Sequence, residues 1–211
     1  MDKASCQPDG LRVVAVIATL PSRAEVVKRA INSVLKQSRL PDALIVVVDL
    51  PPDSPEKLTE KERHAETDEC LAQLRRNYGG VLHLTKNYRT KNVSGTGCWN
   101  TGIMTALEME GSNYNGPTCH TFVAILDDDD EWTPSHLQSC VDVCSDGDWI
   151  VPGLIRDSGR RRTHEMASPE TLRVCDFLRG NPGVQGSNIF VRLPLILRAG
   201  ISLFLLCLAI T

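Results

Sequence analysis

The residues with the clearest capacity for chemistry are four consecutive aspartates at positions 127–130, which directly follow the apolar segment 121–126. Carboxylates packed this closely repel one another and raise one another's pKa, unless a cation or hydrogen-bond donors offset their charge. A hard divalent ion such as Mn²⁺ or Mg²⁺ suits them, held by one or two carboxylates and completed by water and phosphate oxygens. An acidic helix start, capped by Asp130 or Thr133, explains the same residues without a metal. Taken alone, the aspartates favour these two interpretations equally.

Short apolar runs alternate with amphipathic segments along the chain. The runs are rich in β-branched residues and nearly continuous, as in strands that are covered on both faces. Between them, a period of about 3.6 residues predicts helices. The alternation predicts an α/β fold, a doubly wound, mainly parallel sheet flanked by helices. The expected strands are 11–19, 43–49, 81–85, 121–126, 149–154 and 188–191, and the expected helices after the first one are 54–78, 95–110, 134–144 and 168–178.

The first helix is expected to start at a capping box of Ser22 and Glu25, and Pro41 closes it. Ligands of doubly wound sheets bind at the carboxyl ends of the strands. Thr19, Asp49 and the four aspartates all fall at such ends. The topology therefore predicts a single site built from these residues.

Composition narrows the partners and the location. The chain of 211 residues has 23 Lys and Arg against 26 Asp and Glu, a formal net charge of -3, so no overall positive field attracts nucleic acid. The eight cysteines contain no C-x-x-C pair and are expected to be reduced thiols. The N-terminus has no apolar signal segment. A cytoplasmic location is therefore expected, with peripheral attachment to a membrane as the less favoured alternative.

Three further features carry weaker hypotheses. Residues 201–211 form an uncharged apolar tail, shorter than the ~20 residues that span a bilayer, and are expected to be a buried strand or an abnormal chain end. His136, Cys140 and Cys144 have the spacing of one helical face and could bind zinc, but no fourth ligand is apparent, so a half-buried helix face is favoured. The arginines at 160–162 favour a solvated loop over a phosphate site.

The segment 122–134 (FVAILDDDDEWTP) resembles the "FLDADDEW-x-P" stretch of family 2 glycosyltransferases, which have the GT-A fold. The segments 14–23, 30–49 and 95–103 agree with the same family in order and spacing. The resemblance covers residues 11–200, which are expected to form the donor-binding part of a GT-A domain, followed by the atypical apolar tail. The aspartate segment is its most specific part.

The resemblance implies transfer of a sugar from a nucleotide-diphosphate donor with inversion at the anomeric carbon. It implies that Asp129, with Asp127, binds the Mn²⁺ or Mg²⁺ that bridges the diphosphate, as in a DXD motif. A cation at that point stabilises the charge on the leaving diphosphate. The acceptor is an unidentified glycan, lipid or protein. The residues expected to bind the nucleotide-sugar are Thr19 and Arg23 in the nucleotide loop, Asp49 at the base, Asp127 beside the ribose and sugar, and Asn100 and Asp128.

Departures from the family pattern bear on activity. Leu50 stands where a second acid is common, and Trp99 replaces the arginine beside Asn100, with simple core filling as an equal explanation for the tryptophan. The general base for the acceptor hydroxyl is expected beyond the divergence at Gly200, but no Asp or Glu follows Asp176, so the catalytic base is unassigned. The chain resembles one cut short, with the donor half present and the acceptor half missing.

Two other functions are weighed against glycosyl transfer. A non-catalytic nucleotide-binding or partner-binding fragment of GT-A fold is the main alternative, because the base region is absent. A nucleotidyltransferase is less favoured. Such enzymes use a related sheet and an acidic metal site, but they open with a Gly-rich loop bearing Arg and Lys, which does not follow Thr19.

Overall fold

The computed structural model describes residues 10–50, 59–87, 96–113, 120–145, 147–157, 162–165, 175 and 183–199. Several sequence predictions fall on other residues and lie outside this description. They are the tail 201–211, the helix 168–178 apart from Cys175, the first part of the helix 54–78, and the arginines 160 and 161.

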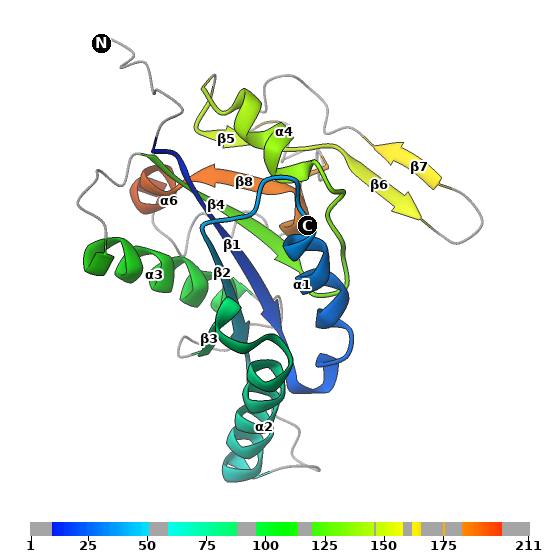
Figure 1. The fold of residues 1–211 in the computed structure, drawn as a ribbon, viewed down its shortest axis with the longest axis vertical. Helices are drawn as coiled ribbons and strands as arrows, with labels where there is room; N and C mark the ends of the chain where they lie inside the picture. Colours follow the sequence, from blue (N-terminus) through cyan, green and yellow to red (C-terminus); the bar gives the residue numbers. More distant parts are fainter. Residues whose placement is uncertain are drawn as a thin grey trace.

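Six strands form the central sheet: β1 (Arg12–Thr19), β2 (Ala43–Val48), β3 (His83–Lys86), β4 (Thr121–Asp127), β5 (Trp149–Ile150) and β8 (Ile189–Arg192). They lie in the order β3-β2-β1-β4-β8-β5 (Figure 1). The first four pair in parallel, whereas β8 is antiparallel to both β4 and β5. The prediction of a mainly parallel sheet is therefore confirmed.

Helices cover both faces of the sheet, as a doubly wound fold requires. One face carries α1 (Val27–Leu35), α2 (Glu60–Tyr78) and α4 (His136–Val143), and the other carries α3 (Thr96–Asn113) and α6 (Leu193–Ala199). Successive strand residues point to opposite faces, so β2 supplies Val46 to one hydrophobic cluster and Val47 to the other. The continuous apolar runs of the sequence are explained by this burial on two sides.

The prediction of one strand over 149–154 is wrong. Its first residues form β5 in the sheet, and its last residue begins β6 (Leu154–Asp157), which pairs with β7 (Arg162–Glu165) in a separate hairpin that projects from the body (Figure 1). Pro152 and Gly153 lie between β5 and β6. Proline lacks an amide donor and glycine weakens a strand, so the chain leaves the sheet at these two residues.

The prediction that Ser22 and Glu25 cap the first helix is also wrong. Residues Pro21–Arg23 form a 3-10 turn, η1, and α1 begins only at Val27, without a side-chain cap. The Glu25 carboxylate is instead paired with the Lys28 ammonium at 2.6 Å. The η1 turn therefore lies between β1 and the helix.

Helices α2, α3 and α4 differ from prediction only at their ends, whereas α6 was not among the expected helices. A capping box starts α2, because the Glu62 amide donates to Thr59 Oγ1 (3.3 Å) and the Thr59 amide donates to Glu62 Oε2 (2.7 Å). This places the first residue of the helix at Glu60 rather than at 54. The helix predicted over 95–110 continues to Asn113.

The described part of the chain has two further properties. None of its helices combines the length and the apolar character needed to cross a bilayer. Its cysteines carry free thiols, at Cys70, Cys98, Cys140, Cys144 and Cys175.

Gly102 allows α3 to approach the sheet closely, and its replacement gives a direct test of this packing. A Cβ at Gly102 would overlap Val16 Cγ1 and lie 3.3 Å from Val47 Cγ2. We expect Gly102→Ala to lower the free energy of unfolding by roughly 1–2 kcal/mol through overpacking. Gly80→Ala is the matched control, because no atom lies within 4 Å of its Cβ position. Chemical denaturation of both variants measures the difference, and equal stabilities would contradict this account of the α3 packing.

Candidate functional site

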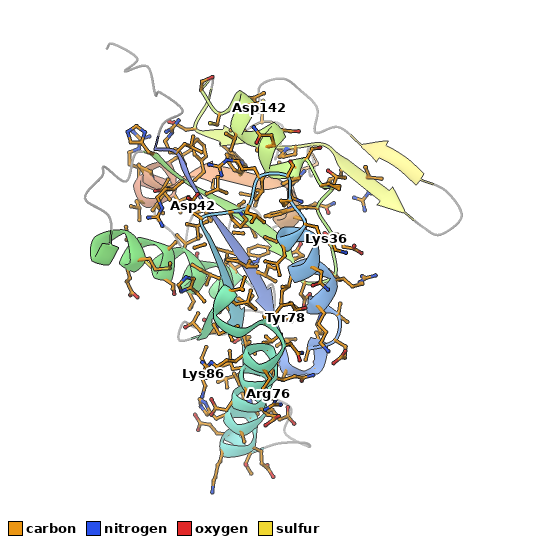
Figure 2. All side chains as sticks on the ribbon, viewed as in Figure 1. Lys36, Asp42, Arg76, Tyr78, Lys86 and Asp142 are labelled. Atoms are coloured by element: carbon orange, nitrogen blue, oxygen red, sulfur yellow. The ribbon has the colours of Figure 1, made fainter. Side chains whose placement is uncertain are left out.

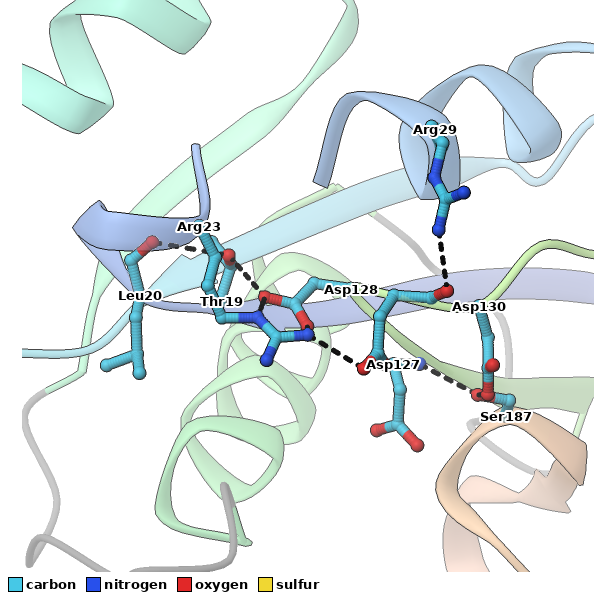
Figure 3. Close-up of polar contacts among 9 residues, drawn as sticks. Thr19, Leu20, Arg23, Arg29, Asp127, Asp128, Asp130 and Ser187 are labelled. Carbon is cyan, nitrogen blue, oxygen red and sulfur yellow. Dashed lines mark hydrogen bonds and ion pairs between the residues drawn. The ribbon is translucent and has the colours of Figure 1, made fainter. Parts of the chain in front are cut away.

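The candidate site is built around the acidic loop, defined here as residues 127–133. Asp127 ends β4 and pairs in register with Ala18 of β1, so the loop begins beside the end of β1. The Asp130 amide donates to the Asp127 carbonyl (3.2 Å), which turns the chain directly after the strand. As the topology predicted, Thr19 and the aspartates lie together at the carboxyl edge of the sheet (Figure 3).

Asp128 is the buried member of the acidic loop, with 7% of the residue exposed. Its Oδ2 accepts hydrogen bonds from Thr19 Oγ1 (2.7 Å) and Arg23 Nε (2.8 Å), and its Oδ1 lies 2.7 Å from Arg23 Nη2. These contacts compensate a carboxylate that would otherwise be costly to bury. Three residues predicted to bind the nucleotide-sugar thus contact one another, and their contact with a donor stays a prediction.

Asp129 is the exposed partner of the same arginine. Its side chain is 59% exposed, and its Oδ2 lies 2.9 Å from Arg23 Nη2. Its backbone carbonyl accepts a hydrogen bond from Arg29 Nη2 (3.1 Å). Hydrogen bonding to Asp129, reinforced by Asp128, raises the pKa of Arg23 above its ordinary value. A single guanidinium therefore pairs with two adjacent carboxylates and offsets only part of their charge.

Ser187 holds the other side of the acidic loop, although it is not among the site residues expected from the sequence. Its Oγ accepts from the Asp127 amide (3.0 Å) and donates to Asp130 Oδ2 (2.5 Å). Its carbonyl accepts from Trp132 Nε1 (3.0 Å). No local sequence pattern points to this hydroxyl, because its contacts lie 57 and 60 residues away in the chain.

The carboxylate of Asp127 is poorly solvated and lies among like charges. Burial, followed by the charges of Asp130 and Asp129, raises the pKa of Asp127 to about 6 from an ordinary value of 3.8. Hydrogen bonding of the Asp127 side chain to Ser187 lowers the same pKa. Asp127 is therefore ionised at neutral pH only at a cost, which a bound cation would remove.

Two buried polar side chains fix the far end of the acidic loop, Ser33 in α1 and Gln37 just after that helix. Ser33 Oγ accepts from the Trp132 amide (3.1 Å). Gln37 Nε2 donates to the Thr133 carbonyl (2.7 Å), and Gln37 Oε1 accepts from the Leu137 amide (3.0 Å) at the start of α4. These bonds give a physical role to Ser33 and Gln37, which the sequence offered only as part of the resembling segment 30–49.

Asp49 follows β2 and lies next to the same edge, because its amide donates to the Thr19 carbonyl (2.9 Å). Its Oδ1 accepts from Asn87 Nδ2 (2.9 Å), and Asn87 Oδ1 accepts from Thr101 Oγ1 (2.7 Å). Burial, followed by the nearby Asp49, raises the pKa of the Cys98 thiol. Asn87 was missed from the sequence, and it links Asp49 to the start of α3.

Near its start, α3 carries Asn100, the remaining residue that was predicted to bind the nucleotide-sugar. Asn100 is 5% exposed, and its Oδ1 has no hydrogen-bond partner among the residues that the structure describes. Beside it, Trp99 packs on the second hydrophobic cluster, as the core-filling interpretation expected. A Cβ on Gly186, in the turn η4 (Gly186–Asn188), would lie 2.7 Å from Trp99 Cζ2 and 2.6 Å from Asp127 Oδ1. Trp99 therefore reaches the surroundings of Asp127.

His136, Cys140 and Cys144 form the half-buried helix face that the sequence favoured over a zinc site. Cys140 and Cys144 belong to the hydrophobic core. His136 stacks on Trp132 with ring centroids 4.6 Å apart, and burial lowers its pKa to about 4. The neutral imidazole is thus part of the packing beneath the acidic loop.

Metal ligands are not preassembled in the described part of the chain, where no group of three or more His, Cys, Asp or Glu side chains could hold an ion. Arg23 engages the side chains of Asp128 and Asp129, and Ser187 engages that of Asp130. The loop nevertheless offers only carboxylate oxygens, the ligand type that Mn²⁺ and Mg²⁺ prefer. The chemistry of these residues therefore fits a hard divalent ion.

Comparison with known proteins finds similar solved structures. No protein-family model and no curated protein matches the chain. Residues 1–349 of TarS from S. aureus match with a TM-score of 0.56 and 15% identity, over 89% of this chain and 49% of TarS 1–349. The same protein in complex with UDP-GlcNAc matches with a TM-score of 0.53 and 14% identity, over 89% and 47%.

A third solved structure is the mannosyltransferase PcManGT from Pyrobaculum calidifontis in complex with GDP-Man and Mn²⁺. It matches with a TM-score of 0.51 and 15% identity, over 92% of this chain and 48% of the mannosyltransferase. The chain spans about half the length of these structures. At such low identity the likeness establishes architecture, and with the sheet order and the position of the acidic loop it leads to one conclusion. This chain has the GT-A fold of the glycosyltransferases.

Proposed function

We propose that residues 11–200 are the donor-binding part of a family 2 type glycosyltransferase, which transfers a sugar from a nucleotide-diphosphate donor by metal-dependent inverting displacement. The observation that carries the proposal is the acidic loop at the carboxyl end of β4, beside the ends of β1 and β2, in a GT-A fold. Solved structures of that fold contain UDP-GlcNAc in one case and GDP-Man with Mn²⁺ in another.

Asp129, with Asp127, would hold the Mn²⁺ or Mg²⁺. A bound divalent ion supplies Lewis-acid stabilisation of the charge that develops on the leaving diphosphate. Asp129 is suited to this role by its exposed carboxylate, and Asp127 by a buried charge that a cation would compensate. Asp127 would also orient the ribose and sugar. Ser187 fixes Asp127 and Asp130 from the opposite side.

The remaining predicted residues bind the nucleotide. Asp49, oriented by Asn87, would accept a hydrogen bond from the base. Thr19 and Arg23 would line the nucleotide loop, with Asp128 anchoring both of them. Asn100 offers a buried carbonyl oxygen to a donor group on the nucleotide-sugar. A cytoplasmic setting and an acceptor that is a glycan, a lipid or a protein complete the proposal.

A nucleotide-binding module without transferase activity is the second candidate. It is considered because the roles proposed above for the described residues concern the donor and the ion, and none of them is that of a base for the acceptor. Binding of nucleotide with Mn²⁺, without transfer or donor hydrolysis, would select this candidate.

The proposal is tested by calorimetric titration of the chain with UDP and GDP, with and without Mn²⁺. We expect one nucleotide to bind in a metal-dependent manner, and Asp129→Ala to weaken that binding about tenfold or more, equivalent to ~1.4 kcal/mol. Asp142→Ala is the control, because Asp142 is an acid of α4 outside the acidic loop (Figure 2). Unchanged binding in Asp129→Ala would refute the metal assignment.

A further inference from the structure

We propose that Arg23 is a built-in counter-ion that occupies the Asp129 carboxylate in the donor-free chain, and that it thereby makes metal binding dependent on the nucleotide diphosphate. This inference rests on the proposed function. It adds that the Arg23 side chain couples binding of the ion to binding of the nucleotide diphosphate. The observation behind it is the ion pair of 2.9 Å between Arg23 Nη2 and Asp129 Oδ2, a carboxylate that is expected to bind the ion.

The two carboxylates that Arg23 holds differ in how firmly they are bound. Two nitrogens, Nε and Nη2, engage both oxygens of Asp128, whose side chain is 10% exposed. Only Nη2 reaches Asp129, whose side chain is 59% exposed. Bidentate, shielded contacts are strong, whereas a single exposed ion pair contributes about 0–1 kcal/mol. Asp128 is therefore the fixed anchor of Arg23, and Asp129 is the exchangeable contact.

A divalent ion that arrives without nucleotide meets two obstacles at Asp129. It must displace Nη2 from the carboxylate, and it must then lie close to a guanidinium that Asp128 and Thr19 keep in place. Like charges at this separation repel, most strongly where solvent is partly excluded. Weak binding of the ion alone is the consequence.

A nucleotide diphosphate removes both obstacles. Arginine binds phosphate oxygens in a forked, charge-assisted geometry, so the diphosphate offers Arg23 a replacement for Asp129. The released Asp129 carboxylate is then available to the ion, and the diphosphate charge offsets the repulsion between ion and guanidinium. Because coupling between two ligands is reciprocal, the ion must raise the affinity for nucleotide by the same factor.

Arg29 distinguishes this role from a general effect of positive charge. Arg29 Nη2 donates to the backbone carbonyl of Asp129 (3.1 Å), and its Nη1 lies 3.9 Å from Glu131 Oε1. It therefore places the same charge beside the same loop without occupying the Asp129 carboxylate. Arg29→Gln removes one charge and leaves the proposed competition intact.

The experiment measures the Mn²⁺ dissociation constant by the loss of the free-ion electron paramagnetic resonance signal, with no nucleotide and with saturating UDP or GDP. We expect Arg23→Gln to bind Mn²⁺ alone about fivefold more tightly than the unsubstituted chain, as removal of an exposed ion pair allows. Arg29→Gln is expected to change this constant by less than about twofold. The tightening of Mn²⁺ binding by nucleotide is expected to be smaller in Arg23→Gln than in the unsubstituted chain.

Arg23→Lys keeps the test decisive if Arg23→Gln does not fold by circular dichroism. Lysine can retain one ion pair with Asp128, but its single ammonium lacks the fork that bridges to Asp129, so a smaller gain in affinity for Mn²⁺ alone is expected. The inference is overturned if neither Arg23 variant binds Mn²⁺ alone more tightly than Arg29→Gln does, while nucleotide still enhances Mn²⁺ binding. Absence of Mn²⁺ binding in every chain, with either nucleotide, would instead refute the proposed function itself.

Discussion

Trp132→Ala is expected to lower the free energy of unfolding by about 3–5 kcal/mol, the range for removing a large buried aromatic side chain. Trp132 is 6% exposed and stacks on His136, with 4.6 Å between ring centroids. Its indole Nε1 donates to the Ser187 carbonyl (3.0 Å), and its amide donates to Ser33 Oγ (3.1 Å). The side chain therefore joins η4, the acidic loop and α4, and its loss leaves a cavity between them.

Trp132→Phe is the matched variant, because it keeps an aromatic ring on His136 and removes only the indole donor. We expect it to cost about 1–3 kcal/mol, mostly from the unpaired Ser187 carbonyl. Urea denaturation of both variants gives the comparison. Metal-dependent UDP or GDP binding should weaken in Trp132→Ala even where the chain is folded, since Ser187 loses one of its contacts with the loop. If the free energy of unfolding falls no further in Trp132→Ala than in Trp132→Phe, the packing described here is contradicted.

The central strands could be predicted because their signal is local. β1, β2 and β4 are short apolar runs, and burial on both faces leaves no polar position to interrupt them. The meeting of Thr19, Asp49 and the aspartates could be predicted too, because parallel strands bring their carboxyl ends to one edge. Neither inference needed knowledge of any particular side-chain contact.

The contacts that shape the site could not be predicted in the same way. Arg23 and Asp128 are 105 residues apart in sequence, and Ser187 and Asp130 are 57 apart. No local pattern encodes such pairs. The failed capping box has a related cause: the sequence from Ser22 satisfies the local rule, but Pro21–Arg23 close a 3-10 turn from which Arg23 reaches the acidic loop. A long-range ion pair and a local cap compete for the same short segment.

The position of Trp99 is consistent with both interpretations of this residue, core filling and replacement of an arginine beside Asn100. It packs on the core, which accounts for its size, and it also lies against Gly186 at the edge of Asp127. The arginine expected at this place would bring a charge toward the donor, whereas the indole brings an apolar wall. Sequence alone could identify the departure, but only the packing of η4 gives the reason why the ring approaches Asp127.

Asp127→Asn is expected to stabilise the metal-free chain at neutral pH by about 1–3 kcal/mol while abolishing metal-dependent nucleotide binding. The pKa of Asp127, raised to about 6 from 3.8, means that ionising this buried carboxylate costs the folded state about 3 kcal/mol at most. Asparagine carries no charge to bury. The same substitution removes a ligand of the proposed ion, so stability and binding are expected to change in opposite directions.

The pH dependence of the free energy of unfolding tests whether the gain in stability comes from the Asp127 charge. Between about pH 4 and 6 Asp127 keeps its proton in the folded chain but loses it in the unfolded chain, so the stability that this proton contributes is lost as the pH rises through this window. His136 acts oppositely: its pKa is lowered to about 4 on folding, so the unfolded chain binds the extra proton and stability falls as the pH drops below 6.5. In Asp127→Asn, of these two effects on stability only that of His136 remains. Denaturation with a chelator present should therefore show a higher free energy of unfolding for Asp127→Asn than for the unsubstituted chain. The difference should be full at pH 7.5 and small at pH 4. A gain of equal size at both pH values would show that the carboxylate charge is not its source.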